Sequence, residues 1–225
     1  MLSSQAIRGR ALRGREVIVA IDGPAGVGKS TVARLLAGRL GFSYLDTGAM
    51  YRAVTWLALE RDVPLEDEAE LAALASANPV SFDDGRVAIA GRDVTGEIRE
   101  TRVDGAVSAV SRHGVIREIM RARQRELAHA GDSVLEGRDI GSVVCPDAEV
   151  KVWLVADPVE RARRRGAERP ETSPDETLTG LRLRDELDAG QMRRAPDAQI
   201  VDSTRLDVDD VVAVIARMVE EARLA

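Results

Sequence analysis

The fold of this chain is decided by one stretch, Gly23-Pro24-Ala25-Gly26-Val27-Gly28-Lys29-Ser30. It follows the apolar run Val17-Ile18-Val19-Ala20-Ile21 and leads into a helical pattern over residues 30–40. A strand, a glycine-rich turn with the spacing Gly-x4-Gly-Lys-Ser and a helix, in this order, form a phosphate-binding loop. Glycines let the backbone N–H groups turn inward toward phosphate oxygens, and the positive end of the helix also favours anions.

We therefore predict a nucleoside triphosphate site on this loop. The Lys29 ammonium would reach the outer phosphates, and the Ser30 hydroxyl would be a ligand of Mg2+. The motif is specific because the chain holds only two lysines, Lys29 and Lys151, against 30 arginines. In chains of this length and composition, the phosphate-loop motif would occur by chance roughly once per thousand chains. The residues expected to bind the nucleotide are Gly23, Pro24, Ala25, Gly26, Val27, Gly28, Lys29, Ser30 and Thr31.

Length and composition predict a single soluble domain. The chain has 225 residues, of which 31 % are charged and 44 % hydrophobic, and its net charge of −6 does not indicate a nucleic-acid binder. No apolar run approaches the about 18 residues that span a bilayer. A single cysteine, Cys145, excludes an internal disulfide framework and fits a reducing compartment, so we expect a cytoplasmic protein without membrane or nucleic-acid partners.

The first fifteen residues differ from the rest. They hold Arg8, Arg10, Arg13 and Arg15 without an acidic residue, and they lack the apolar core and cleavage site of a secretory signal. We expect residues 1–15 to be a disordered basic tail and residues 16–225 to form one domain.

Strand and helix patterns alternate along that domain. We expect strands at 16–23, 42–45, 133–136, 151–156 and 199–202, and helices at 29–40, 49–60, 64–76, 159–168, 176–187 and 208–224, with two more between 100 and 130 that are broken near 113–114. Such alternation predicts an α/β fold of the P-loop NTPase class, with a parallel five-stranded sheet and helices on both faces. A β-hairpin pattern over residues 80–89, around an Asp-Gly turn, interrupts the alternation and indicates an insert at about 60–110.

Polar residues follow several of these strands. Ligands of parallel sheets bind at the carboxyl ends of strands, so we expect Gly23, Asp46, Arg138-Asp139 and Asp157 to gather along one edge. The segments around this edge also carry many arginines, which suit bidentate phosphate contacts. We expect two clusters, one on an acceptor and one over the transferring phosphate, drawn from Arg52, Arg99, Arg117, Arg138, Arg161, Arg164 and Arg184.

Motifs that the sequence lacks exclude several classes of phosphate-loop protein. Guanine-specific GTPases read their base with Asn-Lys-x-Asp, but the only asparagine of the chain is Asn78. Large ATPases usually have an apolar strand that ends in Asp-Asp or Asp-Glu, whereas Asp157-Pro158 offers no second acid to position water. Neither His113 nor His129 is placed as a base, and we expect both at the surface. An acceptor phosphate oxygen needs alignment and charge neutralisation but no deprotonation. A hydroxyl acceptor more often needs a positioned aspartate as a base. These points favour a nucleoside monophosphate kinase.

Several further motifs occur in order along the chain. They are Leu45-Asp46-Thr47-Gly48-Ala49-Met50-Tyr51-Arg52, Gly96-Glu97-Ile98-Arg99, Val107-Ser108-Ala109-Val110 and Glu136-Gly137-Arg138-Asp139-Ile140-Gly141-Ser142-Val143-Val144. Together with Asp22 and the phosphate loop they resemble the bacterial cytidylate kinases, over nearly all of residues 16–225. The resemblance implies an ATP- and Mg2+-dependent kinase that converts CMP and dCMP to CDP and dCDP by direct in-line transfer.

The resemblance also implies roles for individual residues. Lys29, Arg138, Arg161 and Arg164 would be catalytic, the last two on a mobile arginine-rich lid at about 158–175. Thr47 and Arg52 would hold the acceptor phosphate, together with Arg138, and Arg99 lies in a further motif of the acceptor side. Ser108, Arg117 and Asp139 would read cytosine, and Arg184 and Asp188 would contact the sugar. The insert would be the enlarged monophosphate-binding region, and we expect a monomer.

The chain departs from this pattern at one position. Many relatives place a phosphate-binding arginine three residues after the sugar aspartate, where this chain has Gln191, with Arg193 and Arg194 just beyond. Either a nearby arginine substitutes, or the lid arginines carry more of the charge.

A kinase for UMP, AMP or shikimate and a non-catalytic ATP-dependent switch are the alternatives to the (d)CMP kinase, and the sequence does not set the preference among CMP, dCMP and UMP.

Overall fold

The computed structural model describes residues 16–83, 85–168 and 172–224. The expected basic tail at 1–15 and residues 169–171 of the expected lid lie outside the described residues. In the described part, no helix is long and apolar enough to cross a bilayer.

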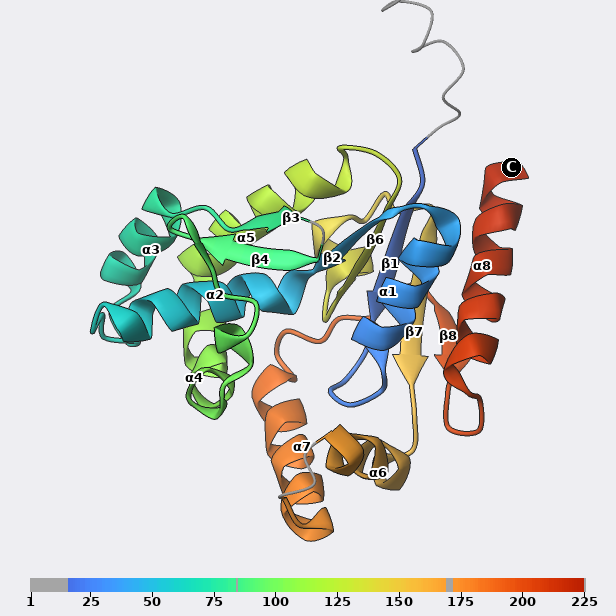
Figure 1. Ribbon diagram of the computed structural model, residues 1–225. Helices are drawn as coiled ribbons and strands as arrows, with labels where there is room; N and C mark the ends of the chain where they lie inside the picture. Colours follow the sequence, from blue (N-terminus) through green and yellow to red (C-terminus); the bar gives the residue numbers. More distant parts are fainter. Residues whose placement is uncertain (1–15, 84, 169–171, 225) are drawn as a thin grey trace, which may run out of the picture.

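The main sheet has five parallel strands, as predicted (Figure 1). Its strands are β1 (Ile18–Asp22), β2 (Ser43–Asp46), β6 (Ser133–Gly137), β7 (Val150–Val155) and β8 (Gln199–Asp202), in the spatial order β2-β6-β1-β7-β8. At the carboxyl end of β1, Asp22 pairs with Gly137 of β6 and with Trp153 of β7. Strands β6 and β7, from distant parts of the sequence, therefore flank the end of β1 from which the phosphate loop begins.

Helices cover both faces of this sheet, which also confirms the prediction. The helices α1 (Lys29–Leu40) and α8 (Val208–Leu224) lie together on one face, while α2 (Thr47–Glu60) and α5 (Gly114–Ala128) pack on the other (Figure 1). Alternate residues of β1 point to opposite faces because strand side chains have a period of two. Val19 and Ile21 enter the α1/α8 core, and Ile18 and Ala20 enter the α2/α5 core.

Capping side chains account for the helix starts that the sequence pattern misplaced. Helix α2 begins at Thr47 because the Asp46 carboxylate accepts the Ala49 N–H at 2.9 Å. Helix α3 (Glu68–Ala77) begins later than expected because Asp67 accepts the Glu70 N–H at 2.9 Å. The bounds of α1, α8 and β8 are those predicted.

Helices α4 (Thr101–Ser111) and α5 are separated near His113, as predicted. His129 is exposed, as expected, but the surface position expected for His113 is wrong. His113 is half-buried, and its Nε2 lies 2.7 Å from the carbonyl oxygen of Leu65.

The hairpin pattern forms β3 (Ser81–Asp83) and β4 (Arg86–Ile89), and a third strand, β5 (Arg92–Asp93), completes a small antiparallel sheet. The sequence analysis missed β5 because two residues are too short to show a period. A short 3-10 turn, Glu97–Arg99, follows it. The small sheet packs against α2 through Val87 and Ile89.

Helices α6 (Pro158–Glu168) and α7 (Pro174–Asp188) lie across the carboxyl edge of the main sheet (Figure 1). Ala162 of α6 and Leu181 of α7 form a small apolar cluster with Ala25 of the phosphate loop. A π-helical turn, Ile140–Val144, follows β6 at the same edge and was not predicted. The phosphate loop thus lies between the sheet and the two helices.

Candidate active site

The phosphate loop joins the end of β1 to the start of α1. Its Gly28 has φ 92°, in the left-handed region that side chains other than glycine rarely adopt. A Cβ at Gly23 would lie 2.2 Å from the carbonyl oxygen of Leu154, so no larger residue fits there without moving β7. These two glycines explain why the loop can turn tightly against the sheet and begin a helix at Lys29.

Lys29 is buried, and its ammonium donates to the carbonyl oxygen of Pro24 at 2.7 Å. Burial, reinforced by the nearby positive charge of Arg138, lowers the pKa of Lys29 to about 7, although Glu136 and Asp22 act in the opposite direction. The ammonium has therefore lost most of its water at the inner side of the loop. An anion that reaches it would meet a poorly solvated cation, where electrostatic attraction is strong.

Ser30 donates its hydroxyl hydrogen to Glu136 Oε1 at 2.6 Å. Glu136 is buried at the end of β6, and desolvation, then the nearby charge of Asp46, raises its pKa. A hydroxyl and a carboxylate from adjacent elements are hard oxygen ligands of the kind that Mg2+ prefers. The chemistry of this pair fits the predicted metal site at Ser30.

Sequence reasoning missed Glu136 and considered Asp157 instead. Asp157 is exposed after β7 and caps α6, since its carboxylate accepts the Val159 N–H at 2.8 Å. Glu136 lies opposite Ile21 in the pairing of β6 with β1, whereas Asp157 lies beyond the end of β7, the other strand that pairs with β1. An acid ending an apolar strand was visible in the sequence, but the strand register that brings it beside Ser30 was not.

Asp22 anchors the π-helical turn to the loop. Its buried carboxylate accepts the N–H groups of Ile140 and Gly141, both at 2.8 Å. Desolvation by burial nevertheless raises the pKa of Asp22 from 3.8 to about 6, with the two backbone bonds opposing that change. The pair of bonds fixes the chain that follows Arg138 and Asp139 against the end of β1.

This pKa predicts a pH dependence of stability. A raised native pKa means that the contribution of Asp22 to folding is fully present below pH 3.8 and is lost as the pH rises through about 6. In urea unfolding from pH 4 to 7, the free energy of unfolding of the wild type should therefore fall more steeply with pH than that of Asp22→Asn. The variant should be less stable throughout, because its amide group faces a backbone donor. Parallel curves would refute the assigned cause.

Arginines gather around Asp104 of α4, among them Arg52 and Arg184, which were predicted to bind the acceptor. The carboxylate accepts from Arg52 at 2.8 Å, Arg184 at 3.1 Å and Arg165 at 3.4 Å, which come from α2, α7 and α6. A second pair joins Arg138 Nε to the buried Asp188 at 3.0 Å.

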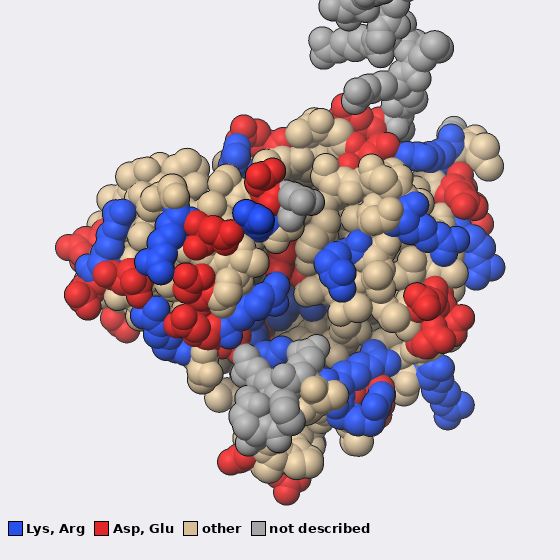
Figure 2. Space-filling model, viewed as in Figure 1, with Lys and Arg blue, Asp and Glu red and all other residues tan. Residues whose placement is uncertain are grey.

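Burial and the charge of Arg52 lower the pKa of Arg184, with the charge of Arg138 adding to this. Four guanidinium groups face two carboxylates, an excess of positive charge that suits a phosphate dianion. Figure 2 shows Lys and Arg atoms in a recess near the middle of the molecule, between the part that carries α2 and α4 and the part that carries α6 and α7. The sequence analysis missed Asp104 and Arg165.

A second cluster centres on Asp139. Its Oδ2 accepts from Arg117 at 2.7 Å and from Arg121 at 2.9 Å. Arg117 also donates to Gln191 at 2.6 Å. The structure thus brings the predicted residues Arg117 and Asp139 together and adds Arg121, which was not foreseen.

Other predicted acceptor residues lie around these clusters. Thr47 is buried and donates to the carbonyl oxygen of Glu136 at 2.6 Å. Ser108 lines a cavity of about 330 Å³ together with Asp104 and Arg184. Arg99 is exposed at the end of its 3-10 turn.

The two arginines of α6 that were predicted to be catalytic donate hydrogen bonds to carbonyl oxygens of the phosphate loop. Arg161 donates to Asp185 at 2.6 Å and to the carbonyl oxygen of Ala25 at 3.0 Å. Arg164 donates to the carbonyl oxygen of Ser203 at 2.6 Å. Both guanidinium groups are engaged with protein atoms in this arrangement, and their catalytic role stays a prediction.

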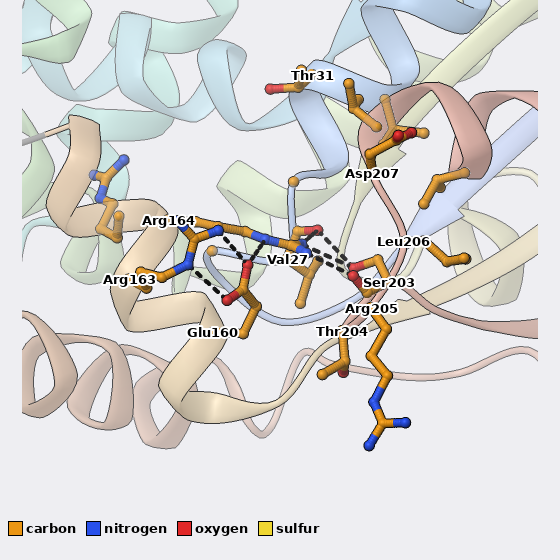
Figure 3. Close-up of a pocket in the computed structure, with 16 residues that line it drawn as sticks. Val27, Thr31, Glu160, Arg163, Arg164, Ser203, Thr204, Arg205, Leu206 and Asp207 are labelled. Atoms are coloured by element: carbon orange, nitrogen blue, oxygen red, sulfur yellow. Dashed lines mark hydrogen bonds and ion pairs between the residues drawn. The ribbon is translucent and has the colours of Figure 1, made fainter.

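A cavity of about 600 Å³ opens behind the loop, between α6 and the segment that follows β8 (Figure 3). Gly26, Gly28 and Thr31 form its loop side. Its remaining wall combines basic and apolar side chains, among them Arg163, Arg164, Arg165, Arg205, Val32, Leu206, Val208 and Val211. The sequence analysis did not predict this cavity, because its walls come from three separate segments.

Comparison with known proteins agrees with these features. The cytidylate kinase family model matches residues 19–221. The chain is 44 % identical over 213 residues to the cytidylate kinase of Lactiplantibacillus plantarum, covering 89 % of this chain and 93 % of the relative. It is 46 % identical over 218 residues to that of Pelotomaculum thermopropionicum, covering 91 % and 96 %.

A solved structure of an uncharacterized protein from Eubacterium ventriosum shares the fold, with a TM-score of 0.55 at 14 % identity, covering 92 % of this chain and 99 % of that one. The family match spans the phosphate loop, the arginine clusters and the segment after β8, so the chain belongs to the cytidylate kinase family.

Proposed function

We propose that this chain transfers the γ-phosphoryl group of ATP to the phosphate of CMP and dCMP. An oxygen of the acceptor phosphate forms a bond to the γ-phosphorus while the bond to the β–γ bridging oxygen breaks, and ADP leaves with that electron pair. The observation that supports this proposal most directly is that Arg138 and Arg184, which pair with Asp188 and Asp104, lie close enough to Lys29 of the phosphate loop for their charges to lower its pKa. No protein nucleophile is needed, because positioning and charge neutralisation suffice for this transfer.

The loop forms the donor side of this proposal. Lys29 would leave the Pro24 carbonyl oxygen for the β/γ-phosphates, and the loop N–H groups would hold the remaining oxygens. Ser30, backed by Glu136, would hold Mg2+. Bound there, the ion would neutralise charge that develops on the phosphates during transfer.

The cavity behind the loop is the proposed place of the adenosine part of ATP. It adjoins Gly28 and Thr31, next to the phosphate position, and apolar side chains such as Leu206 can contact a flat base. Its basic residues would lie along the phosphates. This assignment adds Arg165 and Arg205 to the predicted nucleotide-binding residues.

The acceptor side follows from the two arginine clusters. Thr47, Arg52 and Arg138 would bind the acceptor phosphate, Arg184 and Asp188 would contact the sugar, and Arg99 would be a further substrate-binding residue. Arg117, Asp139 and Ser108 would read the base, because cytosine carries an amino donor beside ring acceptors. We retain the insert at 60–110 as the monophosphate-binding region, the lid at 158–175, the monomeric state and the cytoplasmic location as predictions.

A coupled ADP-release assay with ATP, Mg2+ and a panel of acceptors tests this function. The panel contains CMP, dCMP, UMP, AMP, GMP and shikimate. Turnover mainly with CMP and dCMP is expected. Turnover with another acceptor would retain the donor site and overturn the roles of Ser108, Arg117 and Asp139, and nucleotide binding without any transfer would favour an ATP-dependent switch.

Arg117→Met is expected to raise the KM for CMP by roughly tenfold, because a hydrogen bond from a charged group to the base is lost. The KM for ATP should change much less, since Arg117 lies on the acceptor side, next to Asp139. Steady-state kinetics with each substrate varied in turn measure both values. An equal rise for the two nucleotides would contradict the base-side placement.

A further inference from the structure

Gln191 stands where an arginine was expected, and its half-buried side chain belongs to the Asp139 cluster. Its Oε1 accepts from Arg117 Nη1 at 2.6 Å, and its Nε2 donates to the carbonyl oxygen of Ser111 at 3.3 Å. An arginine in this place would offer Arg117 no acceptor and would bring two guanidinium groups into contact. The position therefore suits a side chain that accepts a hydrogen bond.

The backbone of Gln191 is fixed by a tight turn. The N–H groups of Gln191 and Met192 both donate to the carbonyl oxygen of Asp188, at 2.8 and 3.0 Å. Asp188 is buried and paired with Arg138. The turn therefore links Asp188 and Arg138, the proposed sugar- and phosphate-binding pair, to Gln191 and through it to Arg117 of α5.

Arg117 is held from two directions. Its Nη2 donates to Asp139 Oδ2 at 2.7 Å. Its Nη1 donates to Gln191 Oε1 at 2.6 Å, with the carbonyl oxygen of Ser111 farther away at 3.5 Å, and the two short bonds fix the plane of the guanidinium group. Arg121 uses the same Oδ2. Among the described residues no hydrogen bond reaches Oδ1 of Asp139, so this oxygen can accept from an exocyclic amino group.

We propose that Gln191 is a positioning residue for recognition of the acceptor base. It holds the Arg117 guanidinium in the plane in which Arg117 donates to ring acceptors while Asp139 accepts from the neighbouring amino group. This inference rests on the proposed function, because the pattern of one amino donor beside ring acceptors is that of cytosine. It extends the base-reading site to the segment that follows α7.

Calorimetric titration with CMP, together with steady-state kinetics, tests the role of Gln191. Gln191→Leu should weaken CMP binding roughly tenfold, because Arg117 loses an acceptor, and should reduce the preference for CMP over UMP. The KM for ATP and the kcat at saturating CMP should stay within about twofold of the wild type. Gln191→Glu keeps an acceptor oxygen for Arg117 but loses the Nε2 donor to Ser111, so it should restore part of the CMP affinity that Gln191→Leu loses. Gln199→Leu, at an exposed position of β8, is the matched control and should bind CMP like the wild type.

A double-mutant cycle with Arg117→Met separates positioning from general stability. If Gln191 acts through Arg117, then Gln191→Leu should have no further effect on CMP binding in the Arg117→Met background. Additive losses, an unchanged CMP affinity of Gln191→Leu, or equal losses in Gln191→Leu and Gln191→Glu would each overturn the inference. A wild type that does not bind CMP would overturn the proposed function as well, whereas normal CMP binding by both wild type and Gln191→Leu would overturn only the role of Gln191.

Discussion

Replacement of Lys29 with alanine is expected to lower kcat by roughly 10²- to 10³-fold, the loss typical of removing one preorganised charge donor. The ammonium is buried within the loop, 2.7 Å from the Pro24 carbonyl oxygen, and this burial is the main cause of its lowered pKa. Phosphates would compensate for that desolvation most strongly when charge builds up during transfer. The coupled ADP-release assay measures kcat, and circular dichroism checks that the variant is folded.

Lys151→Ala is the matched control, since Lys151 is the only other lysine of the chain. It lies on β7 away from the loop, where its ammonium donates to Pro146 at 2.6 Å and to Asp197 at 2.7 Å. This variant should keep its kcat even if the lost ion pair lowers stability. Substantial activity in Lys29→Ala, or the same loss in both variants, would refute the role of Lys29.

Glu136→Gln is expected to lower kcat by roughly 10- to 100-fold and to raise the Mg2+ concentration needed for half-maximal activity. The amide oxygen can still accept the Ser30 hydroxyl, so the variant removes the negative charge and retains the geometry. It also removes the carboxylate that favours the charged form of Lys29. Titration of activity with Mg2+ at saturating ATP and CMP measures both effects.

Glu149→Gln makes the same change at the opposite edge of the sheet. Glu149 precedes β7, and its Oε2 accepts the Ile18 N–H at 2.9 Å, so an amide oxygen can replace it without touching the site. The Mg2+ titration of this control should match the wild type. If Glu136→Gln gave the same titration curve as the wild type, Glu136 would have no part in holding the metal.

Local patterns were enough to predict most of the fold. The apolar run before Gly23 predicted β1, the periodic segment after Ser30 predicted α1 with its stop at Gly41, and the alternation of elements predicted a parallel sheet. These features depend on hydrophobic period and on backbone chemistry within a few residues. The predictions of where α2 and α3 begin were less accurate. A capping carboxylate, rather than the apolar pattern, sets their starts at Thr47 and Glu68.

The order of the strands could not be predicted in the same way. The sequence pattern placed an acid at or just after the end of several strands. Both β6 and β7 pair with β1, but the register of β6 places Glu136 opposite Ile21 and within hydrogen-bond distance of Ser30, whereas Asp157 lies beyond the end of β7 and caps α6. Pairing between strands more than a hundred residues apart in sequence depends on packing of the whole sheet, and no local period records it.

By itself, the sequence determined the phosphate loop and the α/β fold, because these follow from local spacing and chemistry. The residues predicted to read cytosine came instead from the resemblance to the cytidylate kinases. The tertiary structure alone decided which charges meet. It placed three arginines from separate helices on Asp104, buried Lys29 beside Glu136, and set Gln191 against Arg117. The physical reason is that charge pairing and desolvation act through space, so they depend on which segments the folded sheet and its helices bring together.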